Sequence, residues 1–293
     1  MVEPPFGRLL TAMVTPFDRA GELDVVVAAK LAGYLVDELG HDGLVVNGTT
    51  GESPTTTDDE KAELLSAVVD AVGDRAAVIA GVGTFDTLHT LELASQASRL
   101  GATGLLVVTP YYSKPPQAGL LRHFTAVADA GEVPVMLYDI PHRSGVAIET
   151  STMIALAEHP QIVAVKDAKG DLAASARVIG ETDLAYYCGE DALTLPLLSV
   201  GAVGVVGTST HFCGLPARAM IEAYLQGDVA TALRLHQQLL PLFTGIFATQ
   251  GVILVKAGLE LQGRSAGDVR APMVAATPDQ VDALSRCLSA AGL

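Results

Sequence analysis

The sequence predicts an α/β fold, a (β/α)8 barrel of the TIM type with a helical extension at its C-terminus. About eight short apolar runs, rich in Val, Leu and Ile, are separated by longer amphipathic stretches. Because the runs show no polar alternation, they are typical of parallel strands that helices cover on both faces. Eight successive strand–helix units indicate a closed barrel. The alternative, a doubly wound sheet, usually has fewer strands and a distinctive first glycine loop.

The predicted strands and helices alternate along residues 1–225, which we expect to form the catalytic barrel domain. Strands are expected at 9–14, 43–46, 77–82, 104–109, 134–138, 162–166, 184–188 and 203–207. Helices between them are expected at 25–39, 58–72, 87–100 and 151–158. The second of these helices has a marked start, because Thr57 and Glu60 match the pattern of a capping box.

Only helices are expected after the last strand. A helix at 219–225 would complete the barrel, and further helices are predicted at 229–240, 246–261 and 278–290. Since these later helices exceed what a barrel requires, we expect residues 226–293 to form the C-terminal helical extension.

Composition and charge narrow the possible functions. The 293 residues are 49% hydrophobic and 17% charged, as in a well-packed globular protein, and the formal net charge is −15. Such acidity argues against binding to nucleic acid or to an anionic membrane. No apolar stretch has the length of a membrane span and no secretory signal pattern is present, so we expect a cytoplasmic protein.

The cysteines and histidines do not indicate a metal site. Cys188, Cys213 and Cys287 are widely spaced and odd in number, so we expect reduced thiols rather than a disulfide framework. The seven histidines are scattered without ligand spacing. We therefore expect neither a metal nor an organic cofactor.

Lys166 is the most informative residue of the chain. It ends an expected strand, directly after four apolar residues. Lysine is almost never fully buried unless it is paired. Burial lowers the pKa of the ammonium group, and the freed amine can form a Schiff base with a carbonyl substrate. The alternative is a strand-end lysine that extends into solvent.

Other polar residues follow the expected strands at the same end, where TIM barrels place their chemistry. They are the loop 47–52, Tyr138, Arg143 and Gly189, the last a candidate substrate contact. The loop offers N–H groups and hydroxyls to a carboxylate, Tyr138 is a candidate proton shuttle and Arg143 a candidate carboxylate clamp. The structural alternatives are a glycine turn, a barrel-filling aromatic ring and a surface charge.

The glycine-rich run 201–207 has two interpretations. It resembles the phosphate-binding loop that some barrels carry near their last two strands. However, it has no dinucleotide pattern and no following Lys-Ser/Thr, which favours small residues in a tightly packed strand.

Four segments resemble the dihydrodipicolinate synthase family in that family's order and spacing. They are 48–53, 109–112, 138–145 and 165–168, and the similarity runs from about residue 9 to the end of the chain, including 256–259. The Gly-Thr-Thr-Gly-Glu and lysine motifs are shared with the wider superfamily of pyruvate-dependent aldolases and lyases. Arg143, within Tyr-x-x-Pro-x-Arg-x-Gly, discriminates better for the synthase.

The resemblance implies condensation of pyruvate with L-aspartate 4-semialdehyde in lysine and diaminopimelate synthesis. Lys166 would form the Schiff base, and Thr49 would link Tyr138 to Tyr112 in a proton relay. Family members take the second tyrosine from a neighbouring protomer, which implies a homo-oligomer, most often a homotetramer. Substrate contacts would come from Thr50 and the Val206 backbone for pyruvate, from Arg143 for the semialdehyde carboxylate, and from Gly189.

The chain departs from the family pattern after Val206, where Gly207-Thr208 replaces the more usual residues. Two alternatives to the synthase therefore stay open, namely another pyruvate-dependent aldolase or lyase similar to N-acetylneuraminate lyase, and a catalytically silent barrel. The resemblance also predicts insensitivity to free lysine. Phe85 and His89 stand where lysine-sensitive relatives carry an asparagine and a glutamate, and Lys61 would repel the ligand's ammonium group.

Overall fold

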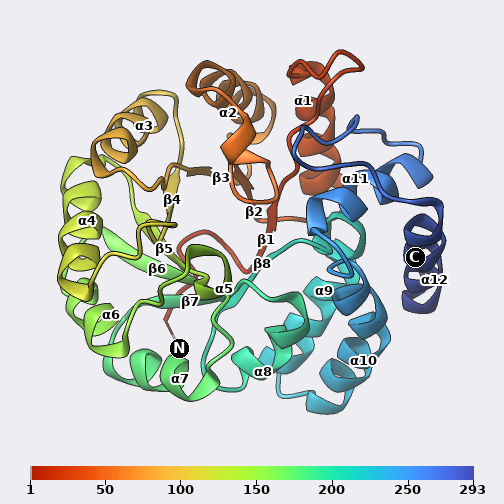
Figure 1. Cartoon of the computed structure of the whole chain (residues 1–293). Coiled ribbons are helices and arrows are strands. Elements are labelled where there is room, and N and C mark those ends of the chain that lie inside the picture. Colours follow the sequence, from red (N-terminus) through yellow and green to blue (C-terminus); the bar gives the residue numbers. More distant parts are fainter. Residues whose placement is uncertain (1) are drawn as a thin grey trace.

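Eight parallel strands form a closed barrel at the centre of the molecule (Figure 1). The computed structural model describes residues 2–293. The predicted fold is confirmed, and strand β8 closes the ring against β1 with Val206 opposite Leu10. The strands are β1 (Leu9–Ala12), β2 (Gly43–Val46), β3 (Ala77–Gly81), β4 (Gly104–Val108), β5 (Val135–Asp139), β6 (Ile162–Asp167), β7 (Ala185–Cys188) and β8 (Gly204–Gly207).

Helices surround the barrel and follow the strands in sequence order (Figure 1). The capping box of Thr57 and Glu60 is present at the start of α2. The expected helix 25–39 ends as an α-helix at Gly33 and continues as a π-helical segment. The elements between β1 and β8 are α1 (Val25–Gly33), η1 (Tyr34–Glu38), η2 (Ser53–Thr55), α2 (Asp58–Val72), α3 (Thr87–Arg99), α4 (Gln117–Ala130), α5 (Pro141–Ser144), α6 (Thr150–Ala157), α7 (Leu172–Glu181), η3 (Asp191–Leu193) and α8 (Thr194–Leu198).

The buried side chains form two layers. One layer lies between the strands and the outer helices, and the other fills the barrel interior. Because successive residues of a strand point to opposite sides, Met136 and Tyr138 face the interior from β5, and Ala164 faces it from β6. The same alternation points Lys166, two residues after Ala164, towards the interior at the C-terminal end of the barrel.

Helix α9 (Thr210–Leu225) begins nine residues before the predicted start at 219. Pro216 lies inside it, and Cys213 has non-helical dihedral angles (φ −111°, ψ 29°). A proline lacks the N–H group of a helix interior and clashes with the preceding turn, so the sequence predicts a later start. The kink at Cys213 accommodates Pro216 within one continuous element.

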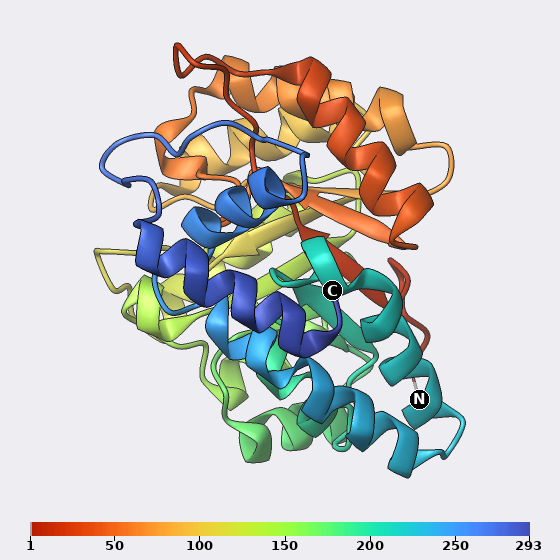
Figure 2. The ribbon, with the colours of Figure 1, turned by 90° about the vertical axis from the view of Figure 1, so that its right-hand side faces the viewer.

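Three further helices follow α9 and pack on one side of the barrel (Figure 2). They are α10 (Val229–Gly245), α11 (Gly251–Leu261) and α12 (Pro278–Ala291). The expected helix 246–261 is wrong at its start, because residues 246–250 form the turn between α10 and α11. Helix α11 is buried almost throughout, between α12 and the strands. Among residues 2–293, no helix has the length and apolar character needed to cross a membrane.

Candidate functional site

Lys166 lies buried at the C-terminal end of β6, with only 5% of its surface exposed. Burial lowers the pKa of its ammonium group from 10.5 to about 8, against the opposing effect of the Asp191 carboxylate. The nearby Arg143 charge lowers the pKa of Lys166 further. At pH 7 about a tenth of this lysine is therefore a neutral amine, far more than at its ordinary pKa. The alternative of a lysine that extends into solvent is wrong.

Tyr138 is the neighbour of Lys166 on the adjacent strand. The two residues are paired in register between β5 and β6, and the Lys166 Nζ atom lies 4.4 Å from the centroid of the Tyr138 ring. Burial raises the pKa of Tyr138 to about 12, although the Arg143 charge and a hydrogen bond with Thr49 act to lower it. The nearby cation eases ionisation as expected, but desolvation outweighs its effect, so the net shift of the Tyr138 pKa is upward. Tyr138 is a protonated phenol in the resting site.

Thr49 and Thr50 lie in the turn between β2 and η2. Thr50 lines the cavity that contains Lys166, and Thr49 borders this cavity and a larger one beside it. The turn is held by the segment that follows β1, because the Thr15 hydroxyl donates a 2.6 Å hydrogen bond to the Gly51 carbonyl. A Cβ atom at Gly51 would lie 3.2 Å from the Met13 carbonyl oxygen, a tight contact that the glycine avoids.

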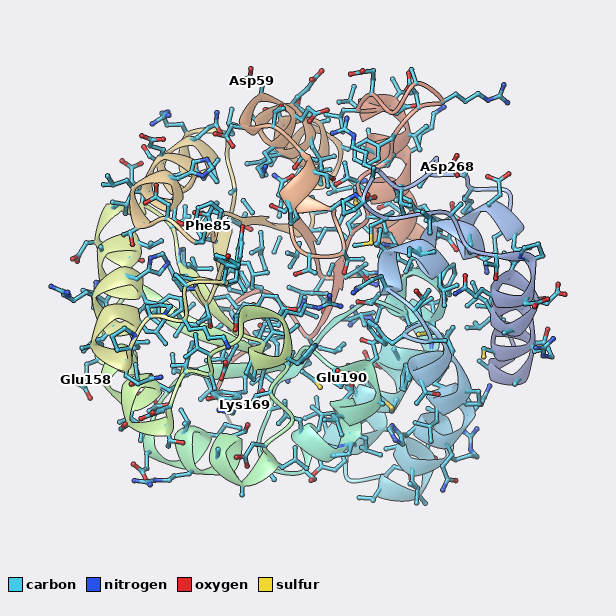
Figure 3. The ribbon with its side chains drawn as sticks, in the orientation of Figure 1. Asp59, Phe85, Glu158, Lys169, Glu190 and Asp268 are labelled. Atoms are coloured by element: carbon cyan, nitrogen blue, oxygen red, sulfur yellow. The ribbon has the colours of Figure 1, made fainter. Side chains whose placement is uncertain are left out.

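The Lys166 cavity, with a volume of about 360 Å³, lies at the C-terminal end of the strands. Glu190, after β7, lines this cavity near the centre of the barrel, whereas Asp59 on α2 and Glu158 at the end of α6 lie at the periphery (Figure 3). The C-terminal segment also reaches this cavity through Phe247, Thr249 and Gln250. The sequence analysis missed these residues because it placed them within a helix.

Arg143 is exposed at the mouth of the Lys166 cavity. Its Nη1 atom donates a 2.9 Å hydrogen bond to the Oε1 atom of Gln250. Tyr138, Arg143 and Lys166 therefore line one cavity, together with Thr49 and Thr50. Arg143 and Lys166 place two cationic side chains in this cavity, beside the carboxyl group of Glu190. Their charge favours an anionic ligand in a chain whose net charge of −15 would otherwise repel it.

Of two predicted substrate contacts, Gly189 lines the Lys166 cavity and Val206 packs in the barrel interior. A Cβ atom at Gly189 would lie 3.0 and 3.1 Å from two side-chain carbons of Lys166, so this glycine leaves room for the lysine. The Val206 side chain is 1% exposed and packs inside the barrel, while Thr208 lines the Lys166 cavity from the end of β8. A substrate contact from Val206 would therefore involve its backbone.

Asp191 is a buried carboxylate close to the lysine that the sequence analysis did not assign. It accepts hydrogen bonds from the backbone N–H groups of Thr208 (3.1 Å) and Ser209 (2.6 Å), and it is 1% exposed. A Cβ atom at Gly207 would lie 2.9 Å from the Asp191 Oδ1 atom. Gly207 therefore permits the close approach through which Asp191 fixes the end of β8. The unusual Gly207-Thr208 pair in the sequence is its signal.

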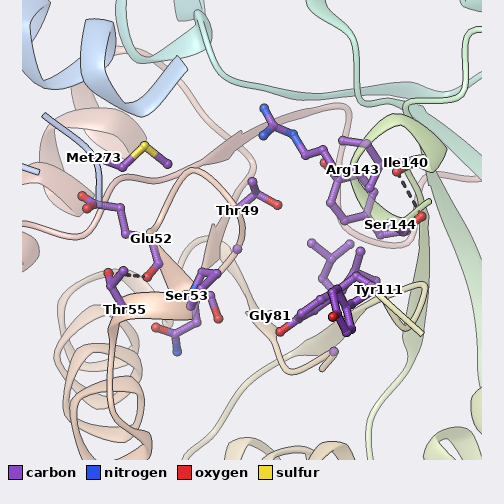
Figure 4. Close-up of a pocket in the computed structure, with 18 of the residues that line it drawn as sticks. Thr49, Glu52, Ser53, Thr55, Gly81, Tyr111, Ile140, Arg143, Ser144 and Met273 are labelled. Atoms are coloured by element: carbon purple, nitrogen blue, oxygen red, sulfur yellow. Dashed lines mark hydrogen bonds between the residues drawn. The ribbon is translucent and has the colours of Figure 1, made fainter. Parts of the chain in front are cut away.

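Tyr112 is 93% exposed, and its φ angle of 71° is uncommon for a residue other than glycine. It does not line the Lys166 cavity. Instead it borders a neighbouring rim cavity of about 500 Å³, which shares Thr49, Tyr138 and Arg143 with the Lys166 cavity (Figure 4). Six of the eight predicted site residues thus line the Lys166 cavity, while Val206 packs in the barrel interior and Tyr112 borders the adjoining rim cavity.

Of the three residues predicted to prevent lysine binding, Phe85 is exposed, His89 is partly exposed and Lys61 is buried. Phe85 is 63% exposed and packs edge-to-face against Tyr111, with the ring centroids 5.6 Å apart. His89 pairs with Asp58 at 2.9 Å. Lys61, in contrast, is buried and its Nζ atom donates to the Thr56 carbonyl at 2.5 Å. The expected repulsion by Lys61 at the rim is wrong, since Lys61 is not among the residues that line that cavity.

A match to the model of the Dihydrodipicolinate synthetase family covers residues 5–291. The chain belongs to this family. It is 67% identical over 288 residues to the 4-hydroxy-tetrahydrodipicolinate synthase of Acidothermus cellulolyticus, a match that covers 98% of this chain and 93% of the relative. It is 60% identical over 291 residues to 4-hydroxy-tetrahydrodipicolinate synthase 2 of Streptomyces coelicolor, covering 99% and 97% of the two chains.

Solved structures of this family share the fold of this chain over nearly its whole length. A crystal structure of the Cyanidioschyzon merolae enzyme with lysine bound superimposes with a TM-score of 0.97 at 43% identity, covering 99% of this chain and 100% of that one. The comparisons confirm the predicted family and favour the synthase over the alternative aldolase or lyase. The silent-barrel alternative has no support either, because the chain is an enzyme of the lyase class.

Proposed function

We propose that this chain catalyses the condensation of pyruvate with L-aspartate 4-semialdehyde, the reaction of a 4-hydroxy-tetrahydrodipicolinate synthase, in lysine and diaminopimelate biosynthesis. The observation that carries the proposal is the buried amine of Lys166, with a pKa of about 8, beside the protonated phenol of Tyr138. Relatives 67% and 60% identical to this chain bear the name of that synthase.

Lys166 begins the reaction. Its neutral amine attacks the ketone carbon of pyruvate, and loss of water leaves a protonated imine. The iminium nitrogen withdraws electrons, so a proton can leave the methyl carbon and form an enamine. The enamine carbon then attacks the aldehyde, whose oxygen takes up a proton. The amino group of the semialdehyde displaces Lys166 from the former ketone carbon, which closes the ring and regenerates the enzyme.

Tyr138 and Thr49 move the protons in this proposal. A phenol with a pKa of about 12 is a donor in the resting site, which suits protonation of the oxygen that leaves as water. The phenolate formed in that step is then the base for the pyruvate methyl group. Thr49, which lies beside Tyr138 in both cavities and acts to lower the pKa of Tyr138, would pass protons between Tyr138 and Tyr112.

The two substrate carboxylates require separate partners. Thr50, the Val206 backbone and Gly189 are assigned to pyruvate, which must lie within reach of Lys166. Arg143 is assigned to the carboxylate of the semialdehyde, because a guanidinium group matches a carboxylate with two parallel hydrogen bonds. Gln250 supports this assignment, since it already orients the guanidinium group from the opposite wall of the cavity.

The proposal includes a homotetramer in which Tyr112 completes the site of a neighbouring protomer. The side chain is 93% exposed on the rim, where a second copy can receive it, and it does not line its own Lys166 cavity. The cytoplasmic location expected from the sequence belongs to the same proposal.

A coupled assay tests the function. The purified protein, supplied with pyruvate and L-aspartate 4-semialdehyde, should form a product that a downstream dihydrodipicolinate reductase consumes with oxidation of a nicotinamide cofactor. Lys166→Ala should remove nearly all turnover while the protein stays folded. Turnover of N-acetylneuraminate but not of the semialdehyde would contradict the proposal.

A further inference from the structure

Glu52 ends the Gly-Thr-Thr-Gly-Glu loop in an unusual conformation. Its φ angle is 54°, in the left-handed region that residues other than glycine rarely adopt, and its residue surface is only 3% exposed. Its backbone N–H donates to the Thr49 carbonyl at 3.2 Å. The conformation of Glu52 is therefore linked directly to the position of Thr49 in the site.

The carboxylate of Glu52 is held from the C-terminal extension. The Lys256 Nζ atom lies 2.8 Å from Oε1, and the backbone N–H of Arg270 donates to Oε2 at 2.8 Å. Figure 4 shows the Glu52 carboxylate directed away from Thr49, towards the side where Met273 lies. The loop thus has one face towards the substrate cavities and the other anchored to residues more than 200 positions later in the chain.

Lys256 is itself fixed on several sides. It projects from the buried helix α11, its side chain is 4% exposed, and its Nζ atom also donates to the Asp268 carbonyl at 2.8 Å. The ammonium group lies 4.3 Å from the centroid of the Phe17 ring. Asp268 lies on the segment after α11, and that segment bonds to the chain beside α1 through the N–H of Phe17 and the carbonyl of Ala266 (Figure 3).

An ion pair buried to this degree gives little net stability, because the desolvation of both charges offsets their attraction. Two alkyl side chains would fill the same space at less cost. The ion pair instead holds a residue, Glu52, that has a left-handed backbone and is hydrogen-bonded to Thr49. This arrangement is suited to fixing the geometry of the Thr49–Thr50 turn.

We propose that Lys256 is a positioning residue, which through its ion pair with Glu52 holds Thr49 and Thr50 in the arrangement that binds the pyruvate carboxylate and contacts Tyr138. The inference rests on the proposed function, because it assigns pyruvate to this turn. It gives the extension an indirect part in the reaction, exerted through Glu52, beyond covering one side of the barrel.

A second ionic link across the same boundary supplies a matched control. The Arg270 guanidinium group bonds to the Glu60 carboxylate at 2.5 Å and to the Thr55 carbonyl at 2.9 Å. Glu60 lies on α2 and makes no hydrogen bond or ion pair with Glu52 or the Thr49–Thr50 turn; it pairs with the side chain of Arg270, whereas Glu52 accepts from the backbone N–H of Arg270. Glu60→Gln therefore weakens the attachment of the extension without removing the anchor of the loop.

The test compares Lys256→Met, Glu52→Gln and Glu60→Gln with the wild type in steady-state kinetics with both substrates varied. Lys256→Met should raise the KM for pyruvate roughly tenfold to a hundredfold, as displacement of a binding group by about 1 Å does, and change the KM for the semialdehyde by less than about threefold. Glu52→Gln, which keeps the shape and the acceptor for Arg270, should shift the pyruvate KM in the same direction by a smaller factor. Glu60→Gln should lower the Tm and leave both KM values unchanged.

Borohydride trapping separates the outcomes. At saturating pyruvate the adduct on Lys166 should still form in Lys256→Met, with the half-trapping concentration raised in parallel with the KM. If the two KM values of Lys256→Met change by the same factor, or if its only change is a lower Tm, the inference is overturned and the proposed function stays intact. Absence of both turnover and trapping in the wild type would overturn the proposed function itself. If Lys256→Met does not fold, Glu52→Gln decides the question by the same comparison of the two KM values.

Discussion

Lys166 and Tyr138 are cross-strand partners at the C-terminal end of the barrel, with the Lys166 Nζ atom 4.4 Å from the centroid of the Tyr138 ring. Burial moves the two pKa values apart, down to about 8 for the amine and up to about 12 for the phenol. At neutral pH the pair therefore offers a nucleophile with a proton donor beside it. That combination is what imine formation from a ketone requires.

The pH dependence of imine formation follows from the lowered pKa of Lys166. Only the neutral amine attacks, so the rate of trapping with pyruvate should rise with pH and reach half of its maximum near pH 8. Quenched trapping between about pH 6 and about pH 10 measures this profile. A half-maximum near 10.5, the ordinary value for lysine, would show that the amine is not desolvated in solution.

Arg143→Ala should damage use of the semialdehyde far more than use of pyruvate. Loss of a charge-assisted pair costs on the order of 1.5–3 kcal/mol, which corresponds to about a tenfold to a hundredfold change in kcat/KM. Kinetics with both substrates varied, together with trapping on Lys166, would measure the difference. Gln250→Ala, which removes the partner of the guanidinium group, should produce a smaller effect of the same kind. Equal losses for both substrates would mean that Arg143 has a structural role.

Tyr112→Phe should reduce turnover strongly while Lys166 still reacts with pyruvate, because the exposed tyrosine acts at a neighbour's site. Mixed oligomers of Tyr112→Phe and Lys166→Ala subunits should regain activity, since one composite site in such an assembly has both residues. Subunits separated by affinity tags after co-expression provide the material. Verified mixed oligomers without recovered activity would place the complete site within one chain.

Free lysine should inhibit the enzyme weakly or not at all. The exposed Phe85 ring offers no hydrogen bond to a zwitterion, and His89 is already paired with Asp58 at 2.9 Å. Polar groups of a bound ligand that find no partner are costly. Initial rates at sub-saturating pyruvate, measured over a lysine titration, test the prediction. Strong inhibition below about 1 mM would show that other rim residues bind the ligand.

The sequence predicts most of the barrel because its strands are short, apolar and regularly spaced. Buried parallel strands lack polar alternation, and the resulting runs mark all eight positions to within about two residues. The late start predicted for α9 has a local cause. A proline normally lies at the end or the beginning of a helix. Helix α9 continues through Pro216 because it is kinked at Cys213.

The site was predictable where chemistry depends on one residue and unpredictable where it depends on a distant partner. Lys166 is recognisable because a lysine after four apolar residues is rare. Asp191, Gln250 and Lys256 act through contacts with β8, Arg143 and Glu52, and no local pattern shows which residues the extension brings near. The raised pKa of Tyr138 likewise depends on complete burial in the assembled barrel.

Reductive trapping with peptide mapping tests the central claim most directly. The wild-type protein is incubated with pyruvate and borohydride, digested and analysed by mass spectrometry, with Lys166→Ala as the control. The account predicts a single pyruvate-derived adduct on Lys166 and none in the control. An adduct on Lys169 or Lys256 in place of Lys166, or no adduct on the wild-type chain, would contradict it.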